Sequence, residues 1–264
     1  MVKKTKLDAK MGKNFDAVYQ QYDFKRSPFG YSREYYEWYR KPMFTEAARW
    51  LEPGSVLDDG GGFGYFSEFV PKHDYYLLDI SKEMLGYYKG KRKFLGRGEK
   101  LPFDGCFFDN VVSLGVLRQV EDEDAYLEEA WRVLKPGGVF VISTPRKEWI
   151  RHLLRSWLFW TVLYTYMKYS IPAKIAGFLG LQAKQLTPDK YFSEVEIKNK
   201  LGALGFIIIH QTRFSKALPG ITSQWFCEKF VNEKKYGQFL FFVCRKPLKN
   251  ETGGAKNRVE KRDC

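Results

Sequence analysis

The sequence predicts an α/β protein with a seven-stranded, mostly parallel sheet, helices on both faces and one antiparallel edge strand. Short apolar runs alternate with amphipathic runs through the middle of the chain, which is typical of a parallel sheet covered by helices. Two further apolar runs near the end of the chain, at 206–209 and 239–243, predict a terminal hairpin. The 264 residues are 44% hydrophobic, which excludes a disordered chain, and the length fits one large domain or one domain plus a small subdomain.

The elements follow in order along the chain. The first five strands are expected at 55–58, 75–79, 93–95, 110–114 and 139–143. Before the fifth strand, a helix places Leu127, Ala130, Trp131 and Leu134 on one face and ends at the breaker sequence Lys-Pro-Gly-Gly. A second helix begins at Ser193, which forms a capping-box pattern with Glu196.

Four segments follow from this order: an N-terminal part at 1–50, a central domain at 51–145 and 191–247, an insertion at 146–190 and a disordered tail at 248–264. The insertion is aromatic and basic, and it contains twelve uncharged residues at 156–167. That run is too short to span a bilayer. It fits an aromatic substrate lid, a helical subdomain packed on the sheet edge, or an interfacial helix at 149–168 lying on a membrane. The lid and the membrane helix both favour a hydrophobic substrate, such as a lipid or a quinone.

Charge and composition say more about where the protein is located than about which partner it binds. The net charge of +13 fits nucleic acid, anionic lipid, an acidic substrate or solubility alone. The N-terminal lysines precede no apolar run, so no secretory signal is expected, and no CxxC pair suggests a metal site. We expect a cytoplasmic protein, or one that attaches peripherally to a membrane.

A glycine-rich turn follows the first strand in the sequence VLDDGGGFG at 56–64, and a helix is expected from near Phe63. Alternating glycines allow close approach of a ligand to the backbone. Asp79 ends the next strand, where a carboxylate can bind ribose hydroxyls. The dinucleotide spacing GxGxxG fails, because its third glycine would fall on Tyr65 or Ser67. An acid before the glycines, Asp58, suits a cationic ligand such as a sulfonium-bearing amino acid.

At this point the sequence resembles the class I S-adenosylmethionine (SAM)-dependent methyltransferases, and most of all the subgroup that includes ubiquinone/menaquinone-biosynthesis methyltransferases. Four blocks carry the resemblance: VLDDGGGFG at 56–64, LLDISKEML at 77–85, GEKLPF with FDNVVSLGVL at 98–117, and WRVLKPGGVFVIST at 131–144. It implies a Rossmann-like sheet, SAM as cofactor and an N-terminal segment, 1–50, whose helices close over the cofactor. The cofactor-binding residues it implies are Asp58, Gly60, Gly62, Gly64, Asp79, Ile80, Met84, Gly98, Glu99, Ser113, Leu114 and Tyr22.

The chain departs from the family at two places. Arg97 stands where family members often carry Asp, and no histidine follows the fourth strand at 117–120. Methyl transfer from a sulfonium needs an in-line arrangement and a base only if the nucleophile arrives protonated. We therefore assign no catalytic residue.

The expected function is transfer of a methyl group from SAM to a small, hydrophobic acceptor by in-line displacement. Two alternatives remain open. The basic charge fits a tRNA or other RNA methyltransferase, and the departures from the family fit a SAM-binding adaptor without transferase activity.

Overall fold

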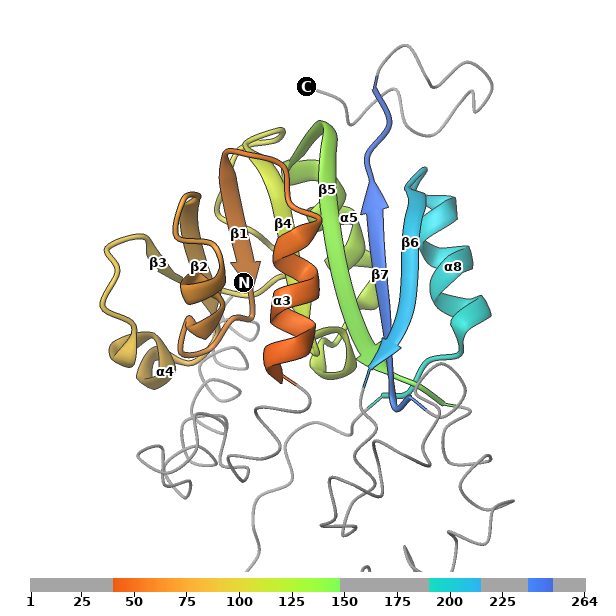
Figure 1. Cartoon of the computed structure of the whole chain (residues 1–264), viewed down its shortest axis with the longest axis horizontal. Coiled ribbons are helices and arrows are strands. Elements are labelled where there is room, and N and C mark those ends of the chain that lie inside the picture. The colour runs from red at the N-terminus through yellow and green to blue at the C-terminus, as the bar shows by residue number, and fades with distance from the viewer. Residues whose placement is uncertain (1–39, 148–189, 215–236, 249–264) are drawn as a thin grey trace, which may run out of the picture.

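The computed structural model describes residues 40–147, 190–214 and 237–248, and these form a seven-stranded sheet between layers of helices (Figure 1). The strand order is β3-β2-β1-β4-β5-β7-β6. The strands are β1 (Ser55–Asp59), β2 (Asp74–Asp79), β3 (Lys93–Leu95), β4 (Phe108–Leu114), β5 (Leu134–Pro145), β6 (Ile207–Phe214) and β7 (Phe239–Arg245).

The predicted mixed sheet is confirmed, including antiparallel pairing at one end. The five strands β1 to β5 pair in parallel. β7 runs antiparallel to both of its neighbours, β5 and β6. The outermost strand on that side is thus β6, and the antiparallel strand lies one place inside it. All parallel strands end at the same edge of the sheet, where open α/β sheets bind ligands.

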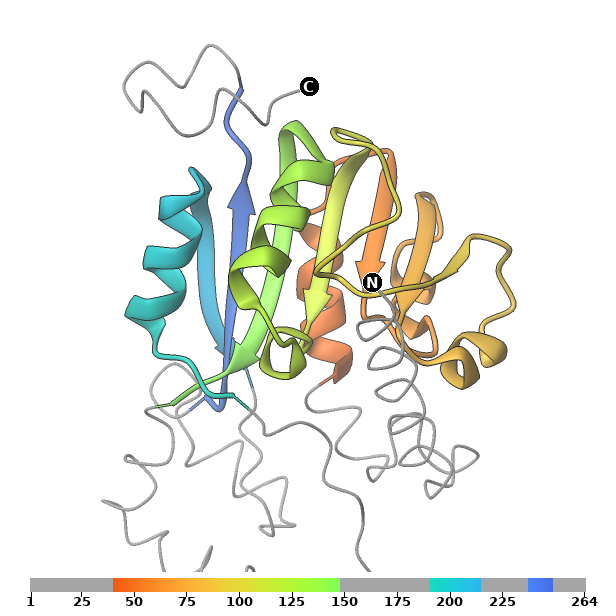
Figure 2. The same cartoon turned by 180° about the vertical axis from the view of Figure 1, so that it is seen from behind.

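Helices cover the two faces of the sheet unequally. α3 (Lys41–Arg49) lies on the face seen in Figure 1, whereas α5 (Glu123–Val133) and α8 (Glu194–Ala203) lie on the opposite face, seen in Figure 2. α4 (Lys82–Tyr87) packs against β2 and β3. Two short 3-10 helices complete the elements, η2 (Tyr65–Phe69) and η3 (Leu117–Gln119).

Two apolar cores hold these layers together. One lies between the sheet and α3, and the other between the sheet and α5 and α8. Strand alternation distributes β1 between them: Val56 belongs to the first core and Leu57 to the second. The predicted capping box is present, with the Ser193 side chain accepting from the Glu196 backbone and the Glu196 side chain accepting from the Ser193 backbone.

Two predictions about local structure need correction. The expected helix after the glycine turn is only the 3-10 helix η2, because Gly64 has a left-handed φ of +72° and delays the first helical residue to Tyr65. The expected breaker at 135–138 ends α5 but also lies inside β5, which already begins at Leu134. The predicted insertion at 146–190 and the tail at 248–264 lie outside the described residues, apart from a few at their ends.

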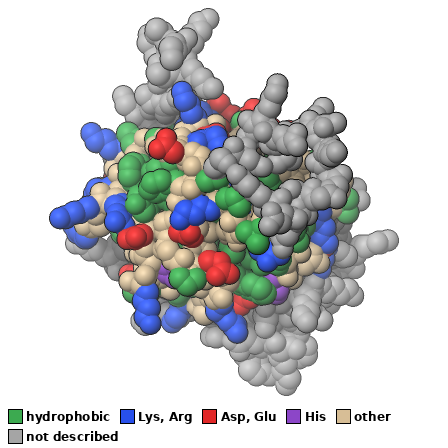
Figure 3. Space-filling view, turned by 90° about the horizontal axis from the view of Figure 1, so that it is seen from above, with side chains coloured by type: hydrophobic (Ala, Val, Ile, Leu, Met, Phe, Trp, Pro, Cys, Tyr) green, Lys and Arg blue, Asp and Glu red, His purple; other side chains and the backbone are tan. Residues whose placement is uncertain are grey.

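The surface of the described part mixes both signs of charge. On the face in Figure 3, Lys and Arg side chains are interspersed with Asp and Glu and with apolar groups. None of the described helices is long and apolar enough to cross a membrane.

Candidate functional site

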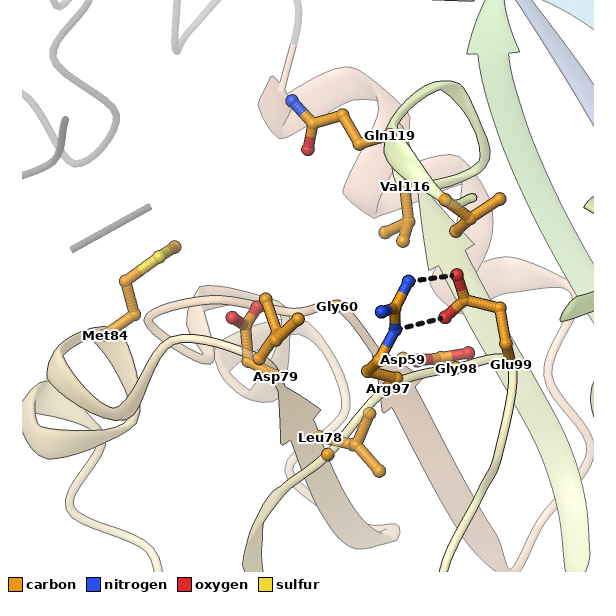
Figure 4. Close-up of a pocket in the computed structure, with 13 residues that line it drawn as sticks. Asp59, Gly60, Leu78, Asp79, Met84, Arg97, Gly98, Glu99, Val116 and Gln119 are labelled. Atoms are coloured by element: carbon orange, nitrogen blue, oxygen red, sulfur yellow. Dashed lines mark hydrogen bonds and ion pairs between the residues drawn. The ribbon is translucent and has the colours of Figure 1, made fainter. Parts of the chain in front are cut away.

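An open pocket lies at the carboxyl ends of β1 and β2, where the loops that follow β3 and β4 meet them (Figure 4). It encloses about 600 Å³, part of it open to solvent. Its lining combines three acids and an arginine with apolar side chains: Asp59, Gly60, Leu78, Asp79, Ile80, Met84, Gly96, Arg97, Gly98, Glu99, Val116, Gln119 and Val120. This size and mixture suit a small molecule with both polar and apolar parts.

The glycine turn forms one wall of this pocket. Gly60 has a φ of +74° and its N–H donates to the Leu78 carbonyl at 2.8 Å. A Cβ on Gly60 would lie 2.4 Å from Cγ2 of Val116, and one on Gly62 would lie 2.4 Å from Cε of Met84. Both positions favour glycine because their backbone is left-handed, and at Gly60 the Val116 side chain also leaves no room for a Cβ.

Asp79 is fixed at the end of β2 by two backbone N–H groups. Its Oδ2 accepts from Gly62 at 2.9 Å, and its Oδ1 accepts from Ser81 at 2.8 Å. The residue is only 7% exposed. A carboxylate held at the end of this strand is placed to accept hydrogen bonds from vicinal hydroxyls of a ligand. Ser81 caps α4, which carries Met84 into the pocket.

Asp58 points away from the pocket lining, toward the α3 side of the sheet. Its carboxylate accepts a hydrogen bond from the Tyr75 hydroxyl and lies against Gly61. Burial raises the pKa of Asp58 to about 7, and Asp79 contributes in the same direction, while Tyr75 and Arg40 oppose it.

Asp59, the next residue, has the opposite orientation and lines the pocket. Burial raises its pKa to about 8, with further contributions from Glu99, Asp58 and Asp79. The Tyr126 hydroxyl acts in the other direction by hydrogen bonding to it. Sequence reasoning missed Asp59; the signal was the paired acids at 58 and 59, of which strand alternation must send one to each face.

The loop at 96–99 is held to the loop after β4 by an ion-pair cluster. The Arg97 guanidinium contacts Glu99 at 2.8 Å and Glu121 at 3.2 Å. Burial would raise the pKa of Glu99, but Arg97 and the backbone N–H of Glu121 hold it below its usual value. Arg97 therefore organises this side of the pocket, where the family pattern often has an acid.

The structure brings six of the predicted site residues into the pocket lining: Gly60, Asp79, Ile80, Met84, Gly98 and Glu99. Five others lie beside it rather than in its wall: Asp58, Gly62, Gly64, Ser113 and Leu114. Ser113 Oγ is 2.7 Å from the Tyr126 hydroxyl, and the Leu114 carbonyl accepts from Arg40 at 3.3 Å. Tyr22 lies outside the described residues. Among those described, no cluster of His, Cys, Asp and Glu could hold a metal ion.

Comparison with known proteins agrees with this geometry. Residues 57–142 match the family model described as Methyltransferase domain. A curated ubiquinone/menaquinone biosynthesis C-methyltransferase from Cupriavidus taiwanensis is 33% identical over 123 residues, which cover 40% of this chain and 50% of that protein. The chain thus spans about half the length of the curated relatives it matches.

Solved structures share the fold. A SAM-dependent methyltransferase from Thermotoga maritima superposes with a TM-score of 0.56 at 19% identity, covering 84% of this chain and 97% of that one. The 1,6-didemethyltoxoflavin-N1-methyltransferase of Burkholderia thailandensis, crystallised with its substrate and S-adenosylhomocysteine, gives 0.54 at 16% identity and covers 89% and 88%. Residues 57–142 are thus similar to a methyltransferase domain, and the described part of the chain shares the fold of solved SAM-dependent methyltransferases.

Proposed function

We propose that the chain transfers a methyl group from SAM to a small, hydrophobic acceptor. The observation that carries the proposal is Asp79, fixed by Gly62 and Ser81 at the end of β2 beside a glycine turn. A carboxylate at the carboxyl end of this strand suits ribose hydroxyls.

The residues present fit SAM in charge and in shape. Leu78, Ile80 and Met84 supply apolar surface for a purine beside Asp79. A buried carboxyl oxygen of Asp59 has no hydrogen-bond partner among the described residues. Asp79 at the carboxyl end of β2 suits a ligand that carries a positive charge, and the glycine turn leaves room for backbone contact. When bound, SAM supplies a methyl group on a positively charged sulfur, whose displacement leaves a neutral thioether.

The work of this chain in that reaction is binding and alignment. Asp79 holds the ribose, and Gly60 with its turn sets the depth of the methionine part. Because the leaving group is neutral, no side chain has to protonate it. A general base is needed only for an acceptor that arrives protonated. Within the described residues no histidine lines the pocket to act as that base.

Two observations support a hydrophobic acceptor. The curated relatives bear names of ubiquinone and menaquinone biosynthesis. The aromatic run at 156–167, outside the described residues, follows β5, whose carboxyl end lies at the ligand-binding edge of the sheet. We assign to segment 146–190 the role of a substrate lid, and to its part at 149–168 peripheral membrane contact where the acceptor is a membrane lipid.

The test compares two substitutions on one strand. Calorimetric titration with SAM and S-adenosylhomocysteine is expected to show binding by the wild type and loss of binding in Asp79→Ala. Asp74→Ala is the matched control, because Asp74 is the exposed first residue of β2 and pairs with Arg92. A radiolabelled-methyl assay on lipid extract and total RNA then identifies the acceptor. Absence of SAM binding by the wild type would refute the proposal. Radiolabel found only in the RNA would show that the acceptor is RNA and not a small hydrophobic molecule.

A further inference from the structure

Asp59 is a residue of the pocket lining whose carboxyl group has one oxygen without a protein partner among the described residues. Asp59 is 1% exposed, and it lies in the lining beside Gly60 and Gly98 (Figure 4). Its Oδ2 has no hydrogen-bond partner within the described part of the chain. A buried polar atom without a partner costs about 1–3 kcal/mol, which a ligand can recover.

Contacts from α5 and β4 fix the direction of this carboxyl group. The hydroxyl of Tyr126, itself completely buried, hydrogen bonds to Asp59 and lies 2.7 Å from Ser113 Oγ. This chain of three groups leaves Oδ2 on the side of the 96–99 loop.

The loop is shaped to fit against that oxygen. A Cβ on Gly98 would lie 2.6 Å from Oδ2 of Asp59 and 2.1 Å from the Tyr126 ring. Any side chain there would cover the oxygen or displace the loop. Glycine at 98 thus lets the loop pack directly against Oδ2 of Asp59 and the ring of Tyr126.

The charges around Asp59 favour its neutral form. The charges of Glu99, Asp58 and Asp79 all act to raise its pKa, while Arg97 is paired with Glu99 and Glu121. Burial is the largest cause that raises its pKa to about 8. At neutral pH the group therefore carries a proton and can act as a hydrogen-bond donor.

We propose that Asp59, through Oδ2, donates a hydrogen bond to a purine ring nitrogen of the adenosyl ligand and selects adenine over a 6-oxopurine. The inference rests on the proposed function, since it assumes an adenosyl ligand. Adenine N1 has an accepting lone pair, whereas N1 of a 6-oxopurine carries a hydrogen. A donor aimed at N1 therefore distinguishes the two bases. When Asp59 loses its proton, the donor is lost and the contact becomes repulsive.

Calorimetric titration with two probes tests this contact. S-Adenosylhomocysteine is compared with S-inosylhomocysteine at pH 7, and 5′-methylthioadenosine, which lacks the titrating amino acid part, is measured from pH 6.5 to 9.5. For the wild type we expect about tenfold weaker binding of the inosyl compound. We also expect methylthioadenosine affinity to fall several-fold as the pH rises through about 8.

Two substitutions separate Asp59 from its neighbours. Asp59→Asn keeps a donor at every pH, so its affinity at pH 7 is expected within threefold of the wild type while the pH dependence attributed to Asp59 disappears. Asp59→Leu removes the donor, and both adenosyl affinity and base selection are expected to fall about tenfold. Asp58, whose pKa is about 7, remains in all variants, so its own titration is present in every profile that is compared. Asp74→Asn is the control and is expected to match the wild type.

The outcomes distinguish this inference from the function beneath it. Failure of the wild type to bind any adenosyl probe overturns both. Normal binding with the same pH profile and the same base selection in Asp59→Asn and the wild type, and no loss in Asp59→Leu, overturns the role of Asp59 alone. If Asp59→Leu fails to fold, the pH profile of Asp59→Asn still decides the question.

Discussion

We predict that Asp59→Asn stabilises the fold at neutral pH, by an amount that grows as the pH rises. Asparagine is nearly the same size as aspartic acid, and its amide oxygen can still accept from Tyr126. The difference between the two residues is the proton. In the folded protein the pKa of Asp59 is about 8, whereas an aspartate in an unfolded chain has a pKa near 4.

The magnitude follows from these two values. Folding keeps a proton bound that the unfolded chain releases above about pH 4. The stability that Asp59 contributes is therefore fully present below pH 4 and is lost progressively until the pH passes about 8. One pKa unit corresponds to about 1.4 kcal/mol, so at pH 7 the loss is about 4 kcal/mol. Asparagine avoids this loss because it has no proton to keep.

Urea denaturation of the wild type and Asp59→Asn at pH 5, 6, 7 and 8 measures the effect. With a urea dependence of about 2 kcal/mol per molar, the midpoint of the variant at pH 7 is expected to rise by about 2 M, with a smaller rise at pH 5. Asp74→Asn, at the exposed opposite end of β2, controls for loss of a negative charge and is expected to show no growing difference. A difference that stays constant with pH, or a variant less stable than the wild type at pH 7, would refute the reasoning.

Three further substitutions test the site and the scaffold separately. Gly60→Ala puts a Cβ into left-handed backbone and against Val116, so titration is expected to show at least tenfold weaker S-adenosylhomocysteine binding; Gly86→Ala, with open space around it, is expected to bind normally. Ser193→Ala removes the cap of α8 and is expected to cost about 1 kcal/mol in urea denaturation, with ligand affinity unchanged. Asn110→Ala breaks hydrogen bonds to both backbone groups of Glu52 and is expected to cost about 2–3 kcal/mol by the same method, and an equal midpoint to the wild type would contradict it.

Much of the sheet was predictable because its strands are short apolar runs with clear ends. β3 has the residues expected for it, and the cap of α8 is the predicted pair of Ser193 and Glu196. These features depend on residues close in sequence. The strand order at the β6 end was less accessible, because it depends on where β7 inserts, and only long-range pairing with β5 and β6 decides that.

The pocket was predictable by position more than by detail. Gly60 and Asp79 were expected at the ends of β1 and β2, and strand parallelism is enough to bring them together. The ion pairs of Arg97 with Glu99 and Glu121 form only because two loops from different crossovers meet. No local sequence pattern predicts that contact. The length of η2 likewise depended on the left-handed φ of Gly64, which the spacing of glycines permits but does not require.

Asp59 shows why a buried acid is informative once its surroundings are known. The sequence of β1 shows that Asp58 and Asp59 point to opposite faces of the sheet. It does not show that the Asp59 face carries the pocket, which depends on the packing of Gly98 and Tyr126 against Asp59. A carboxyl group at this depth lowers stability at neutral pH, because folding must keep it protonated or bury its charge. The same substitution, Asp59→Asn, therefore has two separable effects. It raises the free energy of unfolding at neutral pH and removes a pH-dependent part of ligand binding, whereas a purely structural carboxyl group would give the first effect without the second.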